Sequence, residues 1–171
     1  MSSRFFGWST PLCGCCADPK TCCYVTWCLP CAYGDIVQRF PQGSMCCAGN
    51  RNGAAASFLG LIFADFIFSS LKNQKGAGNF ILGTAGQAGA EIAEGFLLSE
   101  SRRLLRKEFN IPNAKDFWHS DFCLGCFCGS CVVCQELREI KIRDEKKRED
   151  ITIIKPPKLA LDFSSDRNIL L

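Results

Sequence analysis

Histidine is almost absent from the 171-residue sequence, which contains His119 alone. A Ser-His-Asp or Cys-His catalytic group would have to use this residue, and a metal site with two histidines cannot form within one chain. The sequence also lacks a phosphate-binding glycine loop, a nucleophile elbow and an HExxH motif. We therefore expect a protein that is not an enzyme. His119 lies between Asp116 and Asp121, where it is either an additional metal ligand or a surface or packing residue.

The sequence also lacks a strong excess of either charge. Twenty lysines and arginines stand against 17 acidic residues, which gives a net charge of +3. The basic run at residues 102–107 is short. We therefore expect no nucleic-acid partner, because binding to the phosphate backbone normally needs an extended basic surface.

A secretory signal is missing as well. Such a signal needs a basic start followed by an apolar run of about 7–15 residues. Residues 1–10 contain Arg4 but no apolar run of that length, and they lead directly into cysteines. We therefore expect the cysteines to face the reducing cytosol. Thiols, metal ligands and acylation sites are favoured over disulfides there.

Cysteine, by contrast, is abundant: the fourteen residues fall into two blocks, 13–47 and 123–134. Cys-x-x-Cys spacing lets two thiolates reach one ion from a tight turn or a first helical turn, and two such pairs build a tetrahedral zinc site. Pairs with this spacing include Cys28 with Cys31, Cys123 with Cys126, Cys128 with Cys131, and Cys131 with Cys134. The sequence thus predicts a structural zinc site that joins the two blocks.

Other uses of the cysteines remain open. The adjacent pairs 15–16, 22–23 and 46–47 lie near apolar segments and are typical palmitoylation sites. Disulfides, an iron-sulfur cluster and buried thiols are further alternatives. The Cys28–Cys31 pair also has the spacing of a thioredoxin-type motif, but no βαβ pattern surrounds it, so redox catalysis is not favoured.

Two apolar stretches occupy the cysteine-free middle of the chain. Residues 54–71 contain a single charge, Asp65, and residues 76–90 are rich in glycine and alanine. Eighteen helical residues are about 27 Å long, close to a hydrocarbon core of about 30 Å. The pair is either a membrane hairpin, with Asp65 facing inward and small residues such as Ala85 and Gly89 at a close helix contact, or the core of a soluble domain.

Charged helices are expected on both sides of the second cysteine block. Residues 90–109 have an apolar stripe and a basic end, which we expect to be a solvated face or to rest on an anionic membrane. Residues 135–150 balance six acidic and six basic side chains and predict a solvent-exposed helix. The segment 151–171 is apolar enough to dock as an extended tail on a partner.

Two separated motifs resemble a known family. Residues 22–31 read CCYVTWCLPC, preceded by the cysteine and aspartate lead-in at 14–18, and residues 126–143 read CFCGSCVVCQELREIKIR. In this order they resemble the cysteine-rich placenta-specific-eight family, which includes plant cadmium-resistance and fruit-weight or cell-number-regulator proteins. The likeness covers about residues 12–143, with Phe109 and Asn110 in place of the family's Tyr and Gly.

The resemblance implies a cytosol-facing, membrane-associated domain tied to divalent-metal tolerance and transport or to control of cell number. Carried onto this chain, it implies the following metal-ligating residues: Cys22, Cys23, Cys28, Cys31, Cys128, Cys131 and Cys134. Zinc or cadmium would suit such thiolates.

The expected fold is mainly α, a small cysteine-rich domain with two apolar helical segments and little strand. Its expected parts are a proximal cysteine block (1–53), an apolar helical hairpin or membrane-associated insert (54–98), an amphipathic helix end with the distal block (99–143) and a charged helix end with a tail (144–171). The segments 1–53 and 99–143 are expected to form one domain. We expect a membrane location and a protein partner or homo-oligomer. The alternative is a cytoplasmic, non-catalytic subunit of a larger assembly, stapled by its cysteines and docked through its tail.

Overall fold

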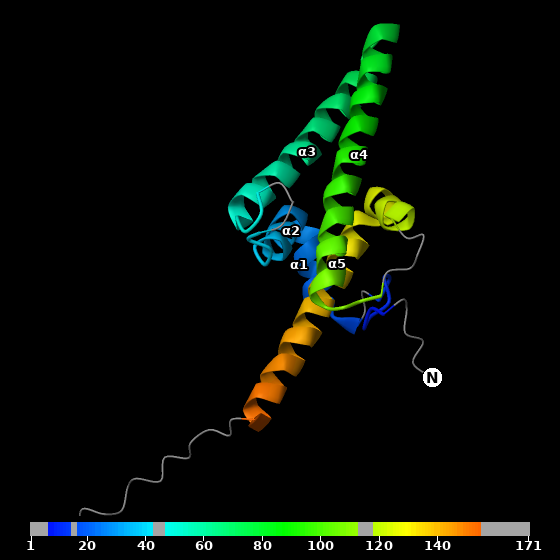
Figure 1. Ribbon diagram of the computed structural model, residues 1–171. Helices are drawn as coiled ribbons and strands as arrows, with labels where there is room; N and C mark the ends of the chain where they lie inside the picture. Colours follow the sequence, from blue (N-terminus) through cyan, green and yellow to red (C-terminus); the bar gives the residue numbers. More distant parts are fainter. Residues whose placement is uncertain (1–6, 15–16, 43–46, 113–117, 155–171) are drawn as a thin grey trace, which may run out of the picture. The chain divides into compact units, whose positions relative to one another are not determined.

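The computed structural model describes residues 7–14, 17–42, 47–112 and 118–154, which form five helices and no strand (Figure 1). The expectation of a mainly helical, cysteine-rich fold with little strand is confirmed. The helices are α1 (Pro19–Trp27), α2 (Leu29–Val37), α3 (Arg51–Lys72), α4 (Ala77–Glu108) and α5 (Trp118–Ile154).

Local capping chemistry fixes where two of these helices begin. The Asp18 side chain accepts a hydrogen bond from the backbone N–H of Thr21 at 3.1 Å, and Pro19 occupies the first turn of α1. The Asn50 side chain accepts one from the N–H of Gly53 at 3.0 Å at the start of α3. Side-chain acceptors at these positions satisfy N–H groups that the helix leaves without partners.

The chain folds into two compact units, Met1–Ile140 and Lys141–Leu171. In the second unit, the described residues continue α5 as a helix, and most of the side chains at 141–151 are exposed. The prediction of a solvent-exposed charged helix is therefore correct for residues 141–150. It is wrong for residues 135–140, because all but Leu137 are buried.

The core of the first unit gathers residues from all five helices. Tyr33 of α2 and Phe58 of α3 are both fully buried, and their ring centroids lie 4.9 Å apart. Val25 of α1, Leu98 of α4 and Val132 of α5 join the same cluster. The two cysteine-rich blocks therefore share one core, although the apolar segment separates them in the sequence.

Helices α3 and α4 run side by side as an antiparallel hairpin (Figure 1). Glycines of α4 face α3: a Cβ on Gly83 would lie 2.6 Å from the Lys72 backbone nitrogen and 2.7 Å from the Phe68 carbonyl oxygen. Small residues thus allow the close helix contact, as the composition predicts. The contact does not use the pair named from the sequence, since Ala85 is exposed and a Cβ on Gly89 would meet nothing within 4 Å.

This contact gives a testable prediction. We expect Gly83→Ala to lower the free energy of unfolding by about 1–3 kcal/mol, because the new methyl group meets backbone atoms that cannot rotate away. The matched control is Gly78→Ala, also in α4, where a Cβ meets nothing within 4 Å. The control should raise stability by up to about 1 kcal/mol through helix propensity. Denaturant unfolding measures both, and an equal effect of the two variants would contradict the close contact.

Candidate functional site

The proximal cysteines lie at the corner between α1 and α2. Cys22 and Cys23 are the fourth and fifth of the nine residues of α1. Cys28 is the N-cap of α2, and Cys31 lies in its first turn. Cys28 and Cys31 are joined by a disulfide bond. The sequence favoured thiols, metal ligands or acylation sites over disulfides, and at this pair that expectation is wrong, because the first turn of α2 brings the two sulfur atoms into bonding distance.

The distal cysteines Cys128, Cys131 and Cys134 lie on α5, whose backbone leaves helical geometry at Cys128 (φ −135°, ψ 36°). Cys134 is buried in the core, and Cys22 of α1 packs against the same core cluster. The fold therefore brings a cysteine of each block to one core. Across the described residues, no three His, Cys, Asp or Glu side chains are gathered closely enough to hold a metal ion, and the zinc site stays a prediction.

Some residues named from the sequence are not among those that the structure describes. Cys15, Cys16 and Cys46, which belong to the candidate palmitoylation pairs, lie outside the described residues, as do the tail 155–171 and the side chain of His119.

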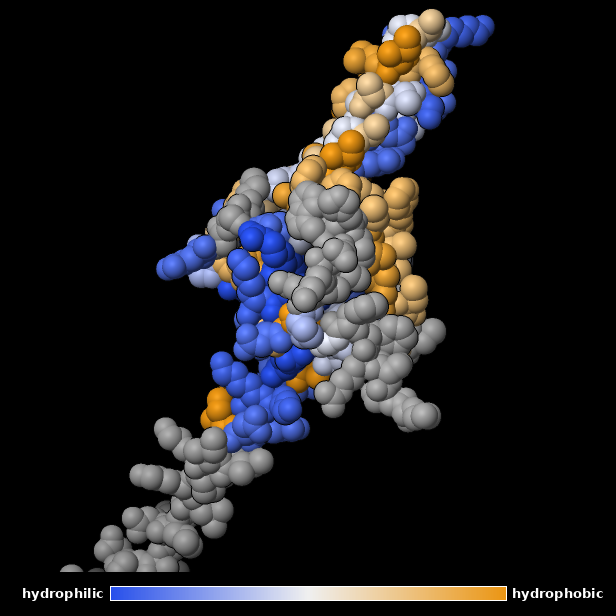
Figure 2. Space-filling model, turned by 45° about the vertical axis from the view of Figure 1, so that its right-hand side comes forward, coloured by the Kyte–Doolittle hydropathy of each residue, from blue (hydrophilic) through white to orange (hydrophobic). Residues whose placement is uncertain are grey.

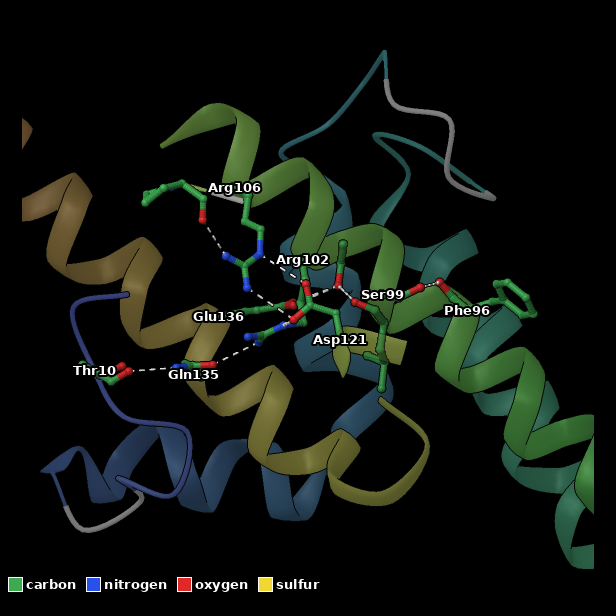
Figure 3. A network of polar contacts seen from close by, with 11 residues as sticks. Thr10, Phe96, Ser99, Arg102, Arg106, Asp121, Gln135 and Glu136 are labelled. Carbon is green, nitrogen blue, oxygen red and sulfur yellow. Dashed lines mark hydrogen bonds and ion pairs between the residues drawn. The ribbon is translucent and has the colours of Figure 1, made fainter. Parts of the chain in front are cut away.

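A buried ionic group joins α4 to α5 (Figure 3). The Arg102 Nε and Arg106 Nε atoms donate to the two carboxylate oxygens of Asp121 at 3.0 and 3.2 Å. Both arginines are buried, with 2% and 4% of their surfaces exposed. The expectation of a solvated or membrane-facing basic helix end is therefore wrong for these two residues, because their partner comes from a helix that follows later in the sequence.

The N-terminal segment closes over this ionic group. The Trp8 ring is buried, and the guanidinium carbons of Arg102 and Arg106 lie 4.4 and 5.3 Å from its centroid. A cation over an indole face is attracted by the ring quadrupole. The stacking therefore adds a further partner for each buried guanidinium, beside Asp121 and the Gln135 amide oxygen for Arg102 and beside Asp121 and the Pro112 carbonyl for Arg106.

Residues 135–139 of α5 hold the same segment by its backbone. The Gln135 amide donates to the Thr10 carbonyl at 2.8 Å (Figure 3), and the Arg138 guanidinium donates to the carbonyls of Pro11, Leu12 and Gly14. The Glu139 carboxylate accepts from the backbone N–H of Ser9 at 2.7 Å and from its hydroxyl at 3.0 Å. We call this set of contacts the N-terminal clasp.

Sequence reasoning missed the clasp because residues 135–150 read as one uniformly charged helix. A local signal was nevertheless present. Glu136 follows Val132 by four residues and precedes Ile140 by four, so it shares a helix face with two apolar residues. A carboxylate within an apolar stripe is expected to be buried with a partner.

Glu136 is fully buried beside Ser101. The Ser101 Oγ lies 2.9 Å from the Leu98 carbonyl oxygen and 2.9 and 3.1 Å from the two Glu136 carboxyl oxygens. The Ser101 hydroxyl donates to the Glu136 carboxyl group or to the Leu98 carbonyl, and it has one hydrogen to share between them. Burial raises the pKa of Glu136 to about 8, despite opposing contributions from Arg102 and the Ser101 hydrogen bond.

The outer surface of the α3–α4 hairpin carries large apolar side chains among small and polar ones (Figure 2). On α3, Phe63, Phe66 and Ile67 are 58%, 69% and 55% exposed. On α4, the exposed large apolar residues near the hairpin turn are Phe80, Ile81 and Leu82. Helix α3 is long and apolar enough to cross a membrane, and only 11% of its most apolar 18-residue window is buried.

Asp65 interrupts this apolar helix on its inner side. Its Oδ1 atom is buried and has no hydrogen-bond partner among the described residues, and it lies within electrostatic range of Glu94 on α4. The carboxylate thus faces the protein, as the sequence predicts for a charge within a membrane-inserted helix.

The part of the chain that is similar to known proteins includes the N-terminal clasp, the cysteine corner and the hairpin. The sequence model of the PLAC8 family matches residues 8–139. The chain is similar to Cell number regulator 5 of Zea mays, with 29% identity over 88% of this chain and 72% of the relative. It is also similar to Cell number regulator 11 of Zea mays, with 24% identity over 80% of this chain and 64% of the relative. No solved structure matches the chain.

Proposed function

The chain belongs to the PLAC8 family, and from this premise we propose that it is a non-catalytic, membrane-associated regulator of cell number. In this proposal the α3–α4 hairpin holds the cysteine-rich domain at the cytosolic face of a membrane. The regulatory role is carried over from the names of the two maize relatives.

The exposed apolar surface of the hairpin is the observation that carries the membrane proposal. Burying a large apolar side chain contributes about 1.5–3 kcal/mol, and the six residues Phe63, Phe66, Ile67, Phe80, Ile81 and Leu82 are each more than half exposed. A lipid phase would cover them without changing the fold of the domain.

The dimensions of the hairpin support insertion from one side. Ala54 and Phe58 at the base of α3 are fully buried in the domain core, so only residues 59–71 project from it. Thirteen helical residues are about 20 Å long, shorter than the hydrocarbon core of about 30 Å. The hairpin would therefore enter the bilayer while both cysteine blocks stay on the same side.

Vesicle flotation tests this proposal. We expect the wild-type protein to float with phospholipid vesicles and the double variant Phe66→Glu/Ile67→Glu to bind at least about tenfold more weakly, because carboxylates in the hydrocarbon region are costly. Phe127→Glu is the matched control, since Phe127 is 84% exposed but lies on α5. Equal flotation of the wild-type protein and the double variant would contradict membrane insertion through the hairpin.

Divalent-metal binding is a second candidate function. It is supported by the donor chemistry of the family-motif cysteines, since thiolates favour zinc and cadmium over calcium and magnesium. It is also supported by the placement of Cys22 and Cys134 at one core. The proposed ligands are those that the resemblance implies, and Cys28 and Cys31 can join them only after their disulfide is reduced.

Elemental analysis of reduced protein purified without chelator tests metal binding. We expect one or two zinc ions per chain, a matching number of thiols protected from alkylation, and loss of metal in Cys131→Ser. Cys13→Ser is the control, because Cys13 is exposed and lies outside the predicted ligand set. Metal-free protein whose thiols all react would exclude a tightly held ion.

A further inference from the structure

The disulfide between Cys28 and Cys31 lies at an accessible corner of the fold. Both cysteines are partly exposed, and the preceding residue, Trp27, is 89% exposed. The bond closes a loop of only four residues between the end of α1 and the first turn of α2. Its sulfur atoms are therefore placed where a small thiol in solution can approach them.

The helices on either side of the bond have other attachments. Val25 of α1 is buried in the core, and so are Ala32, Tyr33 and Ile36 of α2. These contacts hold each helix in place without the bond, so its loss should leave both helices in position.

A polar bridge also links α1 to α2 across the corner. The Tyr24 hydroxyl donates to the Asp35 carboxylate at 2.6 Å, and the Arg51 Nε of α3 donates to the same carboxylate. The angle between the two helices is thus set by contacts that survive cleavage of the disulfide. The bond is not needed as the staple of this corner.

The position of Cys28 favours the chemistry of exchange. Cys28 is the N-cap of α2, a helix of nine residues, and its side chain makes no capping hydrogen bond in the disulfide form. Reduction would therefore break no capping hydrogen bond of α2, and it would return two thiols to an accessible corner of the fold.

We propose that Cys28 and Cys31 form a reversible redox site that exchanges with a low-molecular-weight monothiol of the glutathione class. The thiolate of one monothiol attacks the Cys31 sulfur, the bond between Cys28 and Cys31 breaks, and Cys28 leaves as a thiolate. The thiolate of a second monothiol then attacks the sulfur of the first monothiol in its mixed disulfide with Cys31. Cys31 is released as a thiolate, which takes up a proton. Two electrons pass to the protein, and the two monothiols leave as their disulfide.

A redox titration of the full-length protein tests the proposal. The protein is equilibrated with defined ratios of reduced to oxidised glutathione in the presence of a chelator, quenched in acid and alkylated with a mass tag. We expect Cys28 and Cys31 to be labelled together at the reducing end and to lose both labels together at the oxidising end, as one two-electron transition. Because the chelator removes metal and no vesicles are present, a negative result would count against the redox site alone. It would leave the metal-binding and membrane proposals unaffected.

Single variants identify the exchanging residues. We expect Cys28→Ser to accumulate severalfold more glutathione adduct on Cys31 than on the exposed Cys13 in the same sample. The control Cys13→Ser should keep the two-electron transition of the pair. The helical circular dichroism of the reduced wild type should match that of the oxidised form, because the corner has its other attachments.

Three results would overturn the proposal. A pair that stays unlabelled at every glutathione ratio would be a structural bond out of reach of exchange. A pair that stays fully labelled at every ratio would not form the bond in solution. Oxidation that joins Cys28 to Cys22 or Cys23 instead of Cys31 would place the redox chemistry elsewhere.

Discussion

Replacing Asp121 with alanine is expected to lower the free energy of unfolding by about 3–5 kcal/mol, the range measured when one partner of a buried ion pair is removed. Domains of ordinary stability unfold with about 5–15 kcal/mol. The variant should therefore be largely unfolded at temperatures that leave the wild-type protein intact.

The reason is that Asp121 forms ion pairs with two buried arginines. Arg102 and Arg106 both bind its carboxylate, and both are almost without solvent contact. Without the carboxylate, two like charges would face each other in the core with Trp8 as their common neighbour. Asp121→Asn keeps part of the hydrogen bonding and loses the charge, so its free energy of unfolding should lie between those of the wild type and the alanine variant.

Denaturant unfolding followed by circular dichroism measures the effect. Glu100→Ala is the matched control, because Glu100 binds Arg103 in an exposed pair on the same helix, α4. Surface pairs of this kind contribute about 0.3–0.5 kcal/mol. An Asp121→Ala protein as stable as the Glu100→Ala protein would show that the buried group does not hold α4 to α5.

The second large effect is a pH dependence that Glu136→Gln should remove. The folded-state pKa of Glu136 is raised from 4.5 to about 8, so between these values the folded chain holds a proton that the unfolded chain has lost. The contribution of this residue is therefore fully present below pH 4.5 and is lost as the pH rises toward 8. The slope for one proton is about 1.4 kcal/mol per pH unit.

Glutamine has the shape of the protonated side chain and does not titrate. We therefore expect Glu136→Gln to gain stability relative to the wild type steadily from pH 5 to pH 8 and to be the more stable protein at pH 8. Glu145→Gln, at an exposed position of α5, should follow the wild-type curve. Parallel curves for the wild type and Glu136→Gln would mean that Glu136 is ionised in the folded protein.

Local sequence patterns predicted the helical segments at 54–71, 76–90, 90–109 and 135–150, because apolar runs and stripes act within a few residues of one another. The short helices α1 and α2 of the proximal cysteine block were not predicted individually. The two segments expected at 76–90 and 90–109 form one continuous helix, α4, because no proline interrupts them. The helix contact at Gly83 was predicted in kind but not in position, because composition does not fix which face of α4 meets α3.

The buried polar groups could not be predicted in the same way. Arg102 and Arg106 look like a solvated helix end until Asp121 of another helix is placed beside them. The charges at 135–139 look exposed until the N-terminal segment covers them. At the cysteine corner, the Cys28–Cys31 spacing fits a metal site as well as a disulfide, so the sequence leaves the choice open.

The N-terminal clasp sets the order in which the protein can fold during synthesis. Ser9 and Glu139 are 130 residues apart, and ribosomes add about 5–20 residues per second, so Ser9 waits on the order of ten seconds for its partner. The apolar face of α3 leaves the ribosome well before the domain can close. A nascent chain would therefore expose the apolar face of α3 before the cysteine-rich domain can be completed.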